Sequence, residues 1–239
     1  MQEKTLIKRY ERNKEMITHA EQMCLENARV CVVGCGGLGG YSIEFLARLG
    51  IGHLTVIDGD VFDETNLNRQ VLSNETNLGM SKSEIAKKHV HAINSEVTVT
   101  AISTYFTNDN ADELLKHHDV VVDALDNIET RKRLQKTCTK LKIPFVHGAI
   151  AGWYGQVTTI FPGDETLDSL YPPNEIKGVE KALGNPSFTP AIVSGIQVGE
   201  VLKLLLKRSG VLRHKVLYID LLTHSYDVIV LKSTTDGLE

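Results

Sequence analysis

The sequence predicts an α/β protein built on a doubly wound, mostly parallel sheet, with an antiparallel C-terminal extension and a crossover loop. First, strand-like and helix-like segments alternate along the first 150 residues. Second, the short apolar runs 29–33 and 119–123 are typical of parallel strands buried on both faces. Third, the alternation ends near Gly148, after which strand-like segments lack crossover helices.

The individual elements follow from the same pattern. We expect a charged, helical lead-in over residues 5–27. The predicted strands of the parallel part are 29–33, 53–57, 97–102, 119–123 and 144–148. The predicted helices of that part are 38–49, 81–93, 108–117 and 127–141. Gly50 and Gly52 close the first of these helices, and Ser81 and Glu84 have the spacing of a capping box at the second.

The C-terminal part has a different character. Residues 156–161 form a predicted strand, and residues 162–188 hold four of the six prolines with little periodicity. A loop of that length in a compact domain usually carries function or moves. Thr189 as N-cap and Pro190 at the first position begin a strongly apolar helix, which we expect to end near Gly210.

Two strands, 216–220 and 226–231, follow as an expected hairpin. Because the chain has no internal repeat, low-complexity tract or clear linker, we expect a single domain over residues 1–239. Its expected parts are the helical lead-in 5–27, a parallel-sheet core 28–150, and a segment 151–239 with the last sheet strands, crossover loop and C-terminal helix.

Size and composition indicate an ordinary globular protein. The 239 residues can bury a sizeable core, and 42% of them are hydrophobic and 23% charged. A net charge of −4 gives no reason to expect binding to nucleic acid or to a membrane. No apolar run approaches the roughly 20 residues of a spanning helix, and the charged N-terminus lacks the apolar centre of a signal peptide. We expect a cytoplasmic protein.

The cysteines and His147 are expected to be structural. The four cysteines are Cys24, Cys31, Cys35 and Cys138. None forms a Cys-x-x-Cys pair, so neither a zinc ribbon nor a redox motif is visible, and we expect small buried thiols. His147 lies at a strand end, where we expect a histidine with satisfied hydrogen bonds rather than a catalytic base.

A glycine-rich turn is the most informative feature. Strand 29–33 runs into Gly34-Cys35-Gly36-Gly37-Leu38-Gly39-Gly40, and a helix follows. Such a Rossmann-like turn lets phosphate approach backbone N–H groups at a helix N-terminus, here past Gly36 and Gly37. Asp58 ends the second strand about twenty positions later, where a carboxylate suits ribose hydroxyls. The sequence therefore predicts a nucleotide site, and residues 28–150 are the expected nucleotide-binding core.

Three further side chains follow strand ends or polar turns at the same edge of the predicted sheet. Arg69 and Lys82 are the cations best placed for phosphates, and Asp126 is a candidate Mg²⁺ ligand. The set suits attack at phosphorus, where catalysis is mostly positioning and charge neutralisation. Structural interpretations compete: Asp126 could cap the following helix, Lys82 could be solvated, and Arg69 could pair with Asp60 or Asp63.

The order of these residues resembles the ubiquitin-activating-enzyme-like family, specifically the bacterial HesA/MoeB/ThiF adenylyltransferases. The resemblance covers residues from about Arg9 to Gln156, and more loosely the final helix and strands. The matching elements are Arg9-Tyr10-Glu11-Arg12, Gly34-x-Gly36-Gly37-x-Gly39, Asp58-x-Asp60, Asn66-Leu67-x-Arg69-Gln70, Gly79-x-x-Lys82, Asp123-x-x-Asp126-Asn127-x-x-x-Arg131 and Gly155-Gln156. Together they are highly specific, although any one alone is weak.

This resemblance implies an ATP- and Mg²⁺-dependent reaction. The C-terminal glycine carboxylate of a small ubiquitin-like sulfur carrier, of the ThiS or MoaD kind, attacks the α-phosphate of ATP, giving an acyl-adenylate and pyrophosphate. A C-terminal carboxylate is ionised at neutral pH, so the attack needs no general base. The family further implies that residues 151–239 bind the carrier.

The resemblance also implies roles for single residues. Asp58 would contact ribose, the phosphates would be contacted by Asn66, Arg69 and Lys82, and Asp126 would bind Mg²⁺. Arg12 would reach into a neighbouring subunit's site as an arginine finger, which implies a homodimer. The implied catalytic residues are Arg12, Arg69, Lys82 and Asp126. The other implied nucleotide-site residues are Gly34, Gly36, Gly37, Asp60, Gln70 and Asn127.

The chain departs from the family pattern in its cysteines. Family members commonly carry two Cys-x-x-Cys pairs that bind structural zinc, but this chain has no cysteine after Cys138. We therefore expect no zinc site, with Leu167, Leu170 and Tyr171 packing the first expected location instead. The crossover loop near 174–188 also lacks a nucleophilic cysteine, so chemistry is expected to stop at the acyl-adenylate.

Other functions remain open from the sequence. One is an enzyme resembling the tRNA threonylcarbamoyladenosine dehydratases, although the chain is not basic. Another is a non-catalytic nucleotide-binding scaffold that keeps the fold without turnover. A nicotinamide- or flavin-linked oxidoreductase would leave Arg12, Lys82 and the segment 66–70 unexplained. The sequence does not identify the carrier, its pathway or the sulfur donor.

Overall fold

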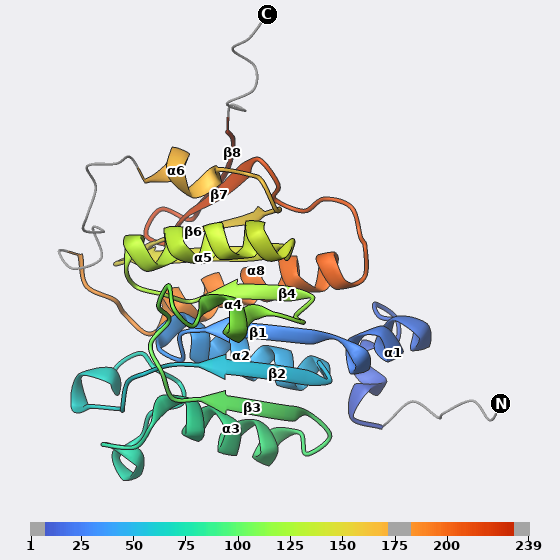
Figure 1. The fold of residues 1–239 in the computed structure, drawn as a ribbon, viewed down its shortest axis with the longest axis vertical. Coiled ribbons are helices and arrows are strands. Elements are labelled where there is room, and N and C mark those ends of the chain that lie inside the picture. Colours follow the sequence, from blue (N-terminus) through green and yellow to red (C-terminus); the bar gives the residue numbers. More distant parts are fainter. Residues whose placement is uncertain (1–7, 172–182, 232–239) are drawn as a thin grey trace, which may run out of the picture.

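The computed structural model describes residues 8–171 and 183–231 and confirms the expected fold class. One eight-stranded sheet has the order β3-β2-β1-β4-β5-β6-β7-β8 (Figure 1). Strands β3, β2, β1, β4 and β5 are parallel, and β5 to β8 pair antiparallel. The strands are β1 Arg29–Val33, β2 His53–Ile57, β3 Thr98–Ile102, β4 Val120–Asp123, β5 Phe145–Ala151, β6 Tyr154–Ile160, β7 Lys215–Asp220 and β8 Ser225–Val230.

Helices connect and cover these strands. The described α-helices are α1 His19–Asn27, α2 Gly37–Leu49, α3 Lys82–Ile93, α4 Ala111–Leu115, α5 Ile128–Leu141, α6 Thr166–Leu170 and α8 Phe188–Leu205. Three short 3-10 helices are η1 Lys8–Asn13, η2 Glu64–Asn66 and η3 Glu75–Asn77. The expected C-terminal hairpin is confirmed by the antiparallel pairing of β7 with β8.

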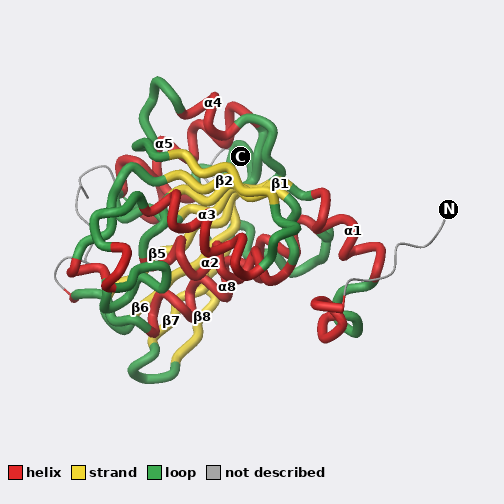
Figure 2. Tube along the Cα trace, turned by 90° about the horizontal axis from the view of Figure 1, so that it is seen from below, coloured by secondary structure: helices red, strands yellow, loops and turns green. Residues whose placement is uncertain are grey.

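The sheet separates two apolar layers, since alternate strand residues point to opposite faces. On β1, Val30 and Val32 join the layer formed with α1, α2, α3 and α8. Cys31 and Val33 join the layer formed with α4, α5 and α6. In Figure 2, α4 lies on one side of the strands and α2, α3 and α8 lie on the other. A sheet covered on both faces keeps its functional groups at the strand ends.

Helix α8 contributes polar side chains as well as apolar ones to the first layer. Ser194 donates to the carbonyl of Leu38 at 2.8 Å, and Gln197 Nε2 donates to the carbonyl of Asp123 at 2.9 Å. Of the helices in the described part of the chain, only α8 is long and apolar enough to span a membrane. Its packing against α2, β5 and β6 gives that apolar character a place in the protein core.

The structure corrects several helix predictions. The lead-in is the short η1 followed by α1, because Thr18 starts a new helix with a capping box to Glu21. Helix α4 has only five residues instead of 108–117, and the left-handed His117, with φ 69°, follows it. Ser81 accepts from the N–H of Glu84, but its hydroxyl also pairs with Ser83 and Ser103, and no reciprocal capping bond forms.

The second half differs more from the prediction. Helix α6 was not predicted and lies inside the segment 162–188; residues 172–182 of the expected crossover loop lie outside the described part of the chain. Helix α8 has Ser187 rather than Thr189 as its N-cap, because the Thr189 hydroxyl donates to the carbonyl of Gly152 at 2.7 Å. It ends at Leu205 instead of near Gly210.

The packing predictions are confirmed apart from one cysteine. Leu167 is fully buried, Tyr171 is 9% exposed, and Leu170 packs against the same cluster. Three of the cysteines are buried, but Cys24 is exposed on α1. The reason is helical geometry: α1 buries its neighbour Leu25, so the preceding side chain points away from the core.

Two helical glycines provide opposite tests of the packing. A Cβ on Gly39 would lie 1.8 Å from the carbonyl oxygen of Gly34, whereas a Cβ on Gly199 would have no neighbour within 4 Å. We expect Gly39→Ala to lower the free energy of unfolding by about 1–3 kcal/mol or more. We expect Gly199→Ala to raise it by roughly 0.5–1 kcal/mol. Urea unfolding of both variants measures this, and a Gly39→Ala protein as stable as the parent would contradict the close approach.

Candidate nucleotide site

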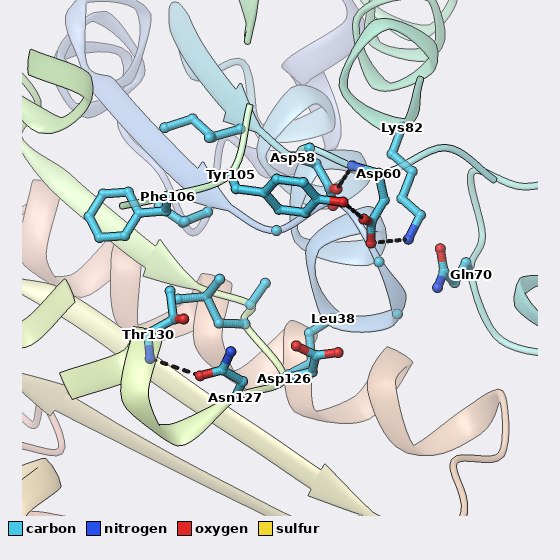
Figure 3. Close-up of a pocket in the computed structure, with 18 of the residues that line it drawn as sticks. Leu38, Asp58, Asp60, Gln70, Lys82, Tyr105, Phe106, Asp126, Asn127 and Thr130 are labelled. Carbon is cyan, nitrogen blue, oxygen red and sulfur yellow. Dashed lines mark hydrogen bonds and ion pairs between the residues drawn. The ribbon is translucent and has the colours of Figure 1, made fainter. Parts of the chain in front are cut away.

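A pocket lies at the carboxyl ends of the parallel strands, around the point between β1 and β4 where the strand order reverses. Ligands of open α/β sheets bind at this position. The pocket has a volume of about 490 Å³ and is shown in Figure 3. Its wall includes these predicted site residues: Gly34, Gly36, Gly37, Asp58, Asp60, Arg69, Gln70, Lys82, Asp126 and Asn127.

The glycines of the turn have two different functions. Gly34 has φ +98°, and a Cβ there would lie 2.5 Å from the carbonyl oxygen of Ala124, so it lets the turn pack against the end of β4. At Gly36 and Gly37 a Cβ would meet only side-chain atoms, at 3.5 and 3.6 Å. These two glycines instead leave the backbone at the start of α2 open to the pocket. The positive end of that helix suits an anion.

Asp58 holds the turn in place. Its carboxylate accepts from the N–H of Cys35 at 2.7 Å and from the N–H of Asp60 at 2.8 Å. Burial raises the pKa of Asp58, and the two backbone hydrogen bonds counteract that rise only in part. The residue predicted for ribose therefore also joins the glycine turn to the end of β2.

Asp60 lies between a buried cation and an exposed aromatic ring. Lys82 Nζ lies 3.2 Å from Oδ2 of Asp60, and the Tyr105 hydroxyl donates to Oδ1 at 2.7 Å (Figure 3). Burial alone would raise the pKa of Asp60, but the Tyr105 hydrogen bond and the Lys82 charge together lower it. The Lys82 side chain is 8% exposed, so the interpretation of a solvated lysine is wrong.

The segment after β2 brings Arg69 and Gln70 to the pocket. Arg69 Nη1 donates to the Thr65 carbonyl and to Asn68 Oδ1, both at 2.9 Å, rather than to Asp60 or Asp63. Gln70 is 6% exposed, and its Oε1 has no hydrogen-bond partner within the described structure. A buried amide oxygen without a partner is costly unless a ligand or water satisfies it.

Asn66 and Arg12 are the two predicted residues that do not line the pocket. Asn66 is 5% exposed and caps η2, where its Oδ1 accepts from the N–H of Asp63 at 3.2 Å. Arg12 is exposed on η1. The N-terminal segment that holds η1 and α1 lies beyond the amino ends of the strands (Figure 1). Tyr10 fixes η1 there, because its hydroxyl accepts from Asn94 Nδ2 at 2.8 Å. Arg12 thus lies at the opposite edge of the sheet from the pocket of its own chain.

Asp126 and Asn127 form the wall across from Asp60 in Figure 3. Asn127, and not Asp126, caps α5, since its Oδ1 accepts from the N–H of Thr130 at 2.9 Å. Asp126 is exposed and has no hydrogen bond or ion pair with another described residue. Its carboxylate is available to a ligand. No group of three or more His, Cys, Asp or Glu side chains able to hold a metal occurs within 8–171 and 183–231.

These residues fit a Mg²⁺-bound triphosphate. Protein-bound Mg²⁺ usually keeps several waters and takes one or two carboxylates together with phosphate oxygens. One free carboxylate, two cations and an open helix N-terminus around one pocket match that pattern. Tyr105 and Phe106 also line the wall and were not predicted as site residues. Their position just after β3 was the available signal, since residues following parallel strands meet at one edge.

Comparison with known proteins confirms the resemblance inferred from the motifs. The model of the ThiF family matches residues 10–237. The SAMP-activating enzyme E1 of Haloferax volcanii is 35% identical over 215 residues, which are 89% of this chain and 80% of that protein. The molybdopterin-synthase adenylyltransferase of Haemophilus influenzae is 34% identical over 201 residues, which are 82% of each protein.

Two further matches limit what the comparison shows about this chain. The adenylyltransferase and sulfurtransferase MOCS3 of Culex quinquefasciatus is 36% identical, but the match covers 83% of this chain and only 46% of that protein. The chain therefore spans about half the length of this relative. The crystal structure of Escherichia coli MccB has a TM-score of 0.81 at 22% identity, covering 98% of this chain and 74% of that one. At this identity the likeness concerns the fold.

The Asp60 environment predicts a pH-dependent contribution to stability. Because the pKa of Asp60 is lower in the folded protein than its ordinary 3.8, its ionised form stabilises the fold above that value. This contribution is lost as the pH falls through the lowered pKa. The Asp60 side chain is 50% exposed, so we expect Asp60→Asn to cost less than about 1 kcal/mol at pH 6.

The difference in unfolding free energy between Asp60→Asn and the parent should shrink from pH 6 to pH 3. Urea unfolding at each pH measures it. Asp109→Asn is the control, since the Asp109 side chain is exposed and has no partner among residues 8–171 and 183–231. A difference that grows toward pH 3 contradicts the direction of the Asp60 shift.

Proposed function

This chain belongs to the ThiF family, and we propose that it is an ATP-dependent adenylyltransferase. Its substrate is the C-terminal glycine carboxylate of a small, ubiquitin-like sulfur-carrier protein. The observation that carries the proposal is the convergence of Lys82, Arg69 and Asp126 around the open glycine turn in one pocket. A protein that only bound a dinucleotide would not need two cations opposite a free carboxylate.

The reaction we propose is attack by a carboxylate oxygen on the α-phosphorus of ATP. A carboxylate–phosphorus bond forms, the bond from that phosphorus to the oxygen bridging to the β-phosphate breaks, and pyrophosphate leaves. The carboxylate is already ionised at neutral pH, and the described pocket wall contains no histidine, cysteine or serine. No proton transfer is required, so catalysis rests on position and charge.

Each pocket residue then has a defined task. The N–H groups at the start of α2 and the cations Lys82 and Arg69 hold the phosphates and stabilise the charge that moves onto pyrophosphate. Bound Mg²⁺ would neutralise part of that charge, with Asp126 as its protein ligand. Lys82 must share its charge between Asp60 and the ligand, because its Nζ lies 3.2 Å from Oδ2 of Asp60.

We further propose that the protein acts as a cytoplasmic homodimer. Arg12 lies at the amino ends of the strands and the pocket lies at their carboxyl ends, so Arg12 does not reach the pocket of its own chain. Its role as an arginine finger therefore requires a second subunit. A guanidinium suits this task because it stays charged and its planar fork matches phosphate oxygens. The absence of cysteine after Cys138 supports an activity that ends at the acyl-adenylate and leaves sulfur transfer to another protein.

The first test concerns the two central pocket residues. We expect Lys82→Ala and Asp126→Ala each to lower carrier-dependent ATP–pyrophosphate exchange by about 10²–10³-fold, because each loses a charge that stabilises the transition state. The exchange is measured with several small proteins that end in Gly-Gly. Lys140→Ala and Asp112→Ala are matched controls, since these two exposed residues pair with each other away from the pocket.

Wild-type exchange in Lys82→Ala or Asp126→Ala would refute the site assignment. ATP binding without exchange, across the whole set of carriers, would instead favour a non-catalytic nucleotide-binding protein. Exchange stimulated by tRNA and not by a carrier protein would move the substrate to nucleic acid.

The second test concerns Arg12. An Arg12→Ala subunit and an Asp126→Ala subunit should each be inactive alone, but a hybrid dimer contains one complete site. Random mixing gives hybrids as half of all dimers, so about a quarter of the wild-type exchange rate should return. If the mixture stays inactive although subunits demonstrably exchange, Arg12 does not act across a subunit interface.

A further inference from the structure

The reaction proposed above gives no task to the buried histidine next to the pocket wall. His147 on β5 is fully buried, which confirms that it is structural rather than a free base. Its Nδ1 lies 2.7 Å from Oδ2 of the fully buried Asp123, and its Nε2 lies 3.1 Å from the Tyr171 hydroxyl. Burial lowers the pKa of His147, so the neutral ring is favoured. Nδ1–H then donates to Asp123, and Nε2 accepts from Tyr171.

The Tyr171 hydroxyl connects this histidine to the pocket wall. Besides donating to His147, its oxygen accepts from Gln156 Nε2 at 2.6 Å and from Arg131 Nη1 at 3.4 Å. The rings of His147 and Tyr171 meet edge to face, with centroids 5.8 Å apart. Arg131 is 3% exposed and itself lines the pocket. The network therefore runs from the protein interior to the wall of the nucleotide site.

Both ends of this network hold the backbone of one residue, Leu125. Asp123 Oδ1 accepts from the N–H of Leu125 at 3.0 Å. From the other side, Arg131 donates to the Leu125 carbonyl through Nε at 3.1 Å and Nη2 at 2.7 Å. Leu125 immediately precedes Asp126. The residue just before the free carboxylate is thus fixed at its N–H and at its carbonyl by residues that contact His147 or Tyr171.

We propose that His147 and Tyr171 are positioning residues that hold the 124–126 loop, so that Asp126 presents its carboxylate to a Mg²⁺-bound nucleotide. This inference rests on the proposed function for its ligand. The physical reason is satisfaction of buried polar groups. Without the hydroxyl, His147 Nε2 loses its nearer donor and keeps only Gln156 Nε2 at 3.4 Å, while Gln156 and Arg131 lose an acceptor. Arg131 can then shift, and the Leu125 carbonyl shifts with it.

Tyr171→Phe tests the inference, because it removes only the hydroxyl and keeps the ring. Thr55→Val is the matched control. It removes the hydroxyl that lies 2.7 Å from Nε2 of a second histidine, the part-buried His118, away from the pocket. We expect amide hydrogen exchange of the Leu125 N–H to be about fivefold faster in Tyr171→Phe, the ratio that loss of one typical hydrogen bond gives. Thr55→Val should leave it unchanged.

A second measurement distinguishes loss of the Asp126 position from a general destabilisation of the protein. Calorimetric ATP binding should weaken about tenfold in Tyr171→Phe when Mg²⁺ is present, and stay within about twofold when Mg²⁺ is chelated. Arg131→Lys, which keeps the charge but lacks the fork to the Leu125 carbonyl, should give the same pattern if Tyr171→Phe folds poorly.

Unchanged Leu125 exchange in Tyr171→Phe and Arg131→Lys overturns the inference, and so does equal weakening of ATP binding with and without Mg²⁺. Failure of the proposed function looks different. A wild-type protein that binds no ATP in the presence of Mg²⁺ refutes that function. The amide hydrogen exchange rates of Leu125 still decide whether the network holds the loop.

Discussion

The pair of hydrogen bonds that Asp58 accepts from Cys35 and Asp60 determines the shape of the site. It joins the glycine turn after β1 to the end of β2, two segments that the chain separates by a whole helix. Because Gly34 and Gly39 lack side chains, the same turn can also pack against the end of β4. The start of α2 is thereby fixed at the point where three strands end, and the other pocket groups are arranged around it.

Charge balance in the pocket follows from this arrangement. Lys82 is buried and Asp60 is half exposed, so their pairing keeps a cation inside the wall without leaving it uncompensated. Arg69 is held by carbonyl and amide oxygens, which orient the guanidinium without neutralising its charge. Asp126 lies across the pocket with no protein partner in the part of the chain described here. The site thus has positive charges that attract an anion and a negative charge that attracts the divalent cation bound to it.

The sequence allowed much of this site to be predicted, because the residues after parallel strands converge wherever the strands pair in order. Asn66 shows the limit: a polar residue three positions before Arg69 is equally able to complete the capping box of a short 3-10 helix, and in the structure its Oδ1 does so with Asp63. The start of α8 was misplaced for a similar reason, since the Thr189 hydroxyl donates to the carbonyl of Gly152 in the turn between β5 and β6. Tyr105 was missed although it follows β3, because its residue type alone does not indicate a ligand for phosphate or metal. The position of Arg12 needed the fold, because the lead-in has no strand order to place it.

The hydrogen bonds of α8 have a consequence for how the chain can be divided. Its Ser194 and Gln197 bond carbonyls in the first turn of α2 and at the end of β4, next to the nucleotide pocket. A fragment that stopped after residue 150 would leave those two carbonyls without their side-chain donors and would expose an apolar face of the sheet. The two halves of the sequence are therefore mutually dependent for stability, and the nucleotide-binding half is not a module that could be transplanted without its C-terminal helix.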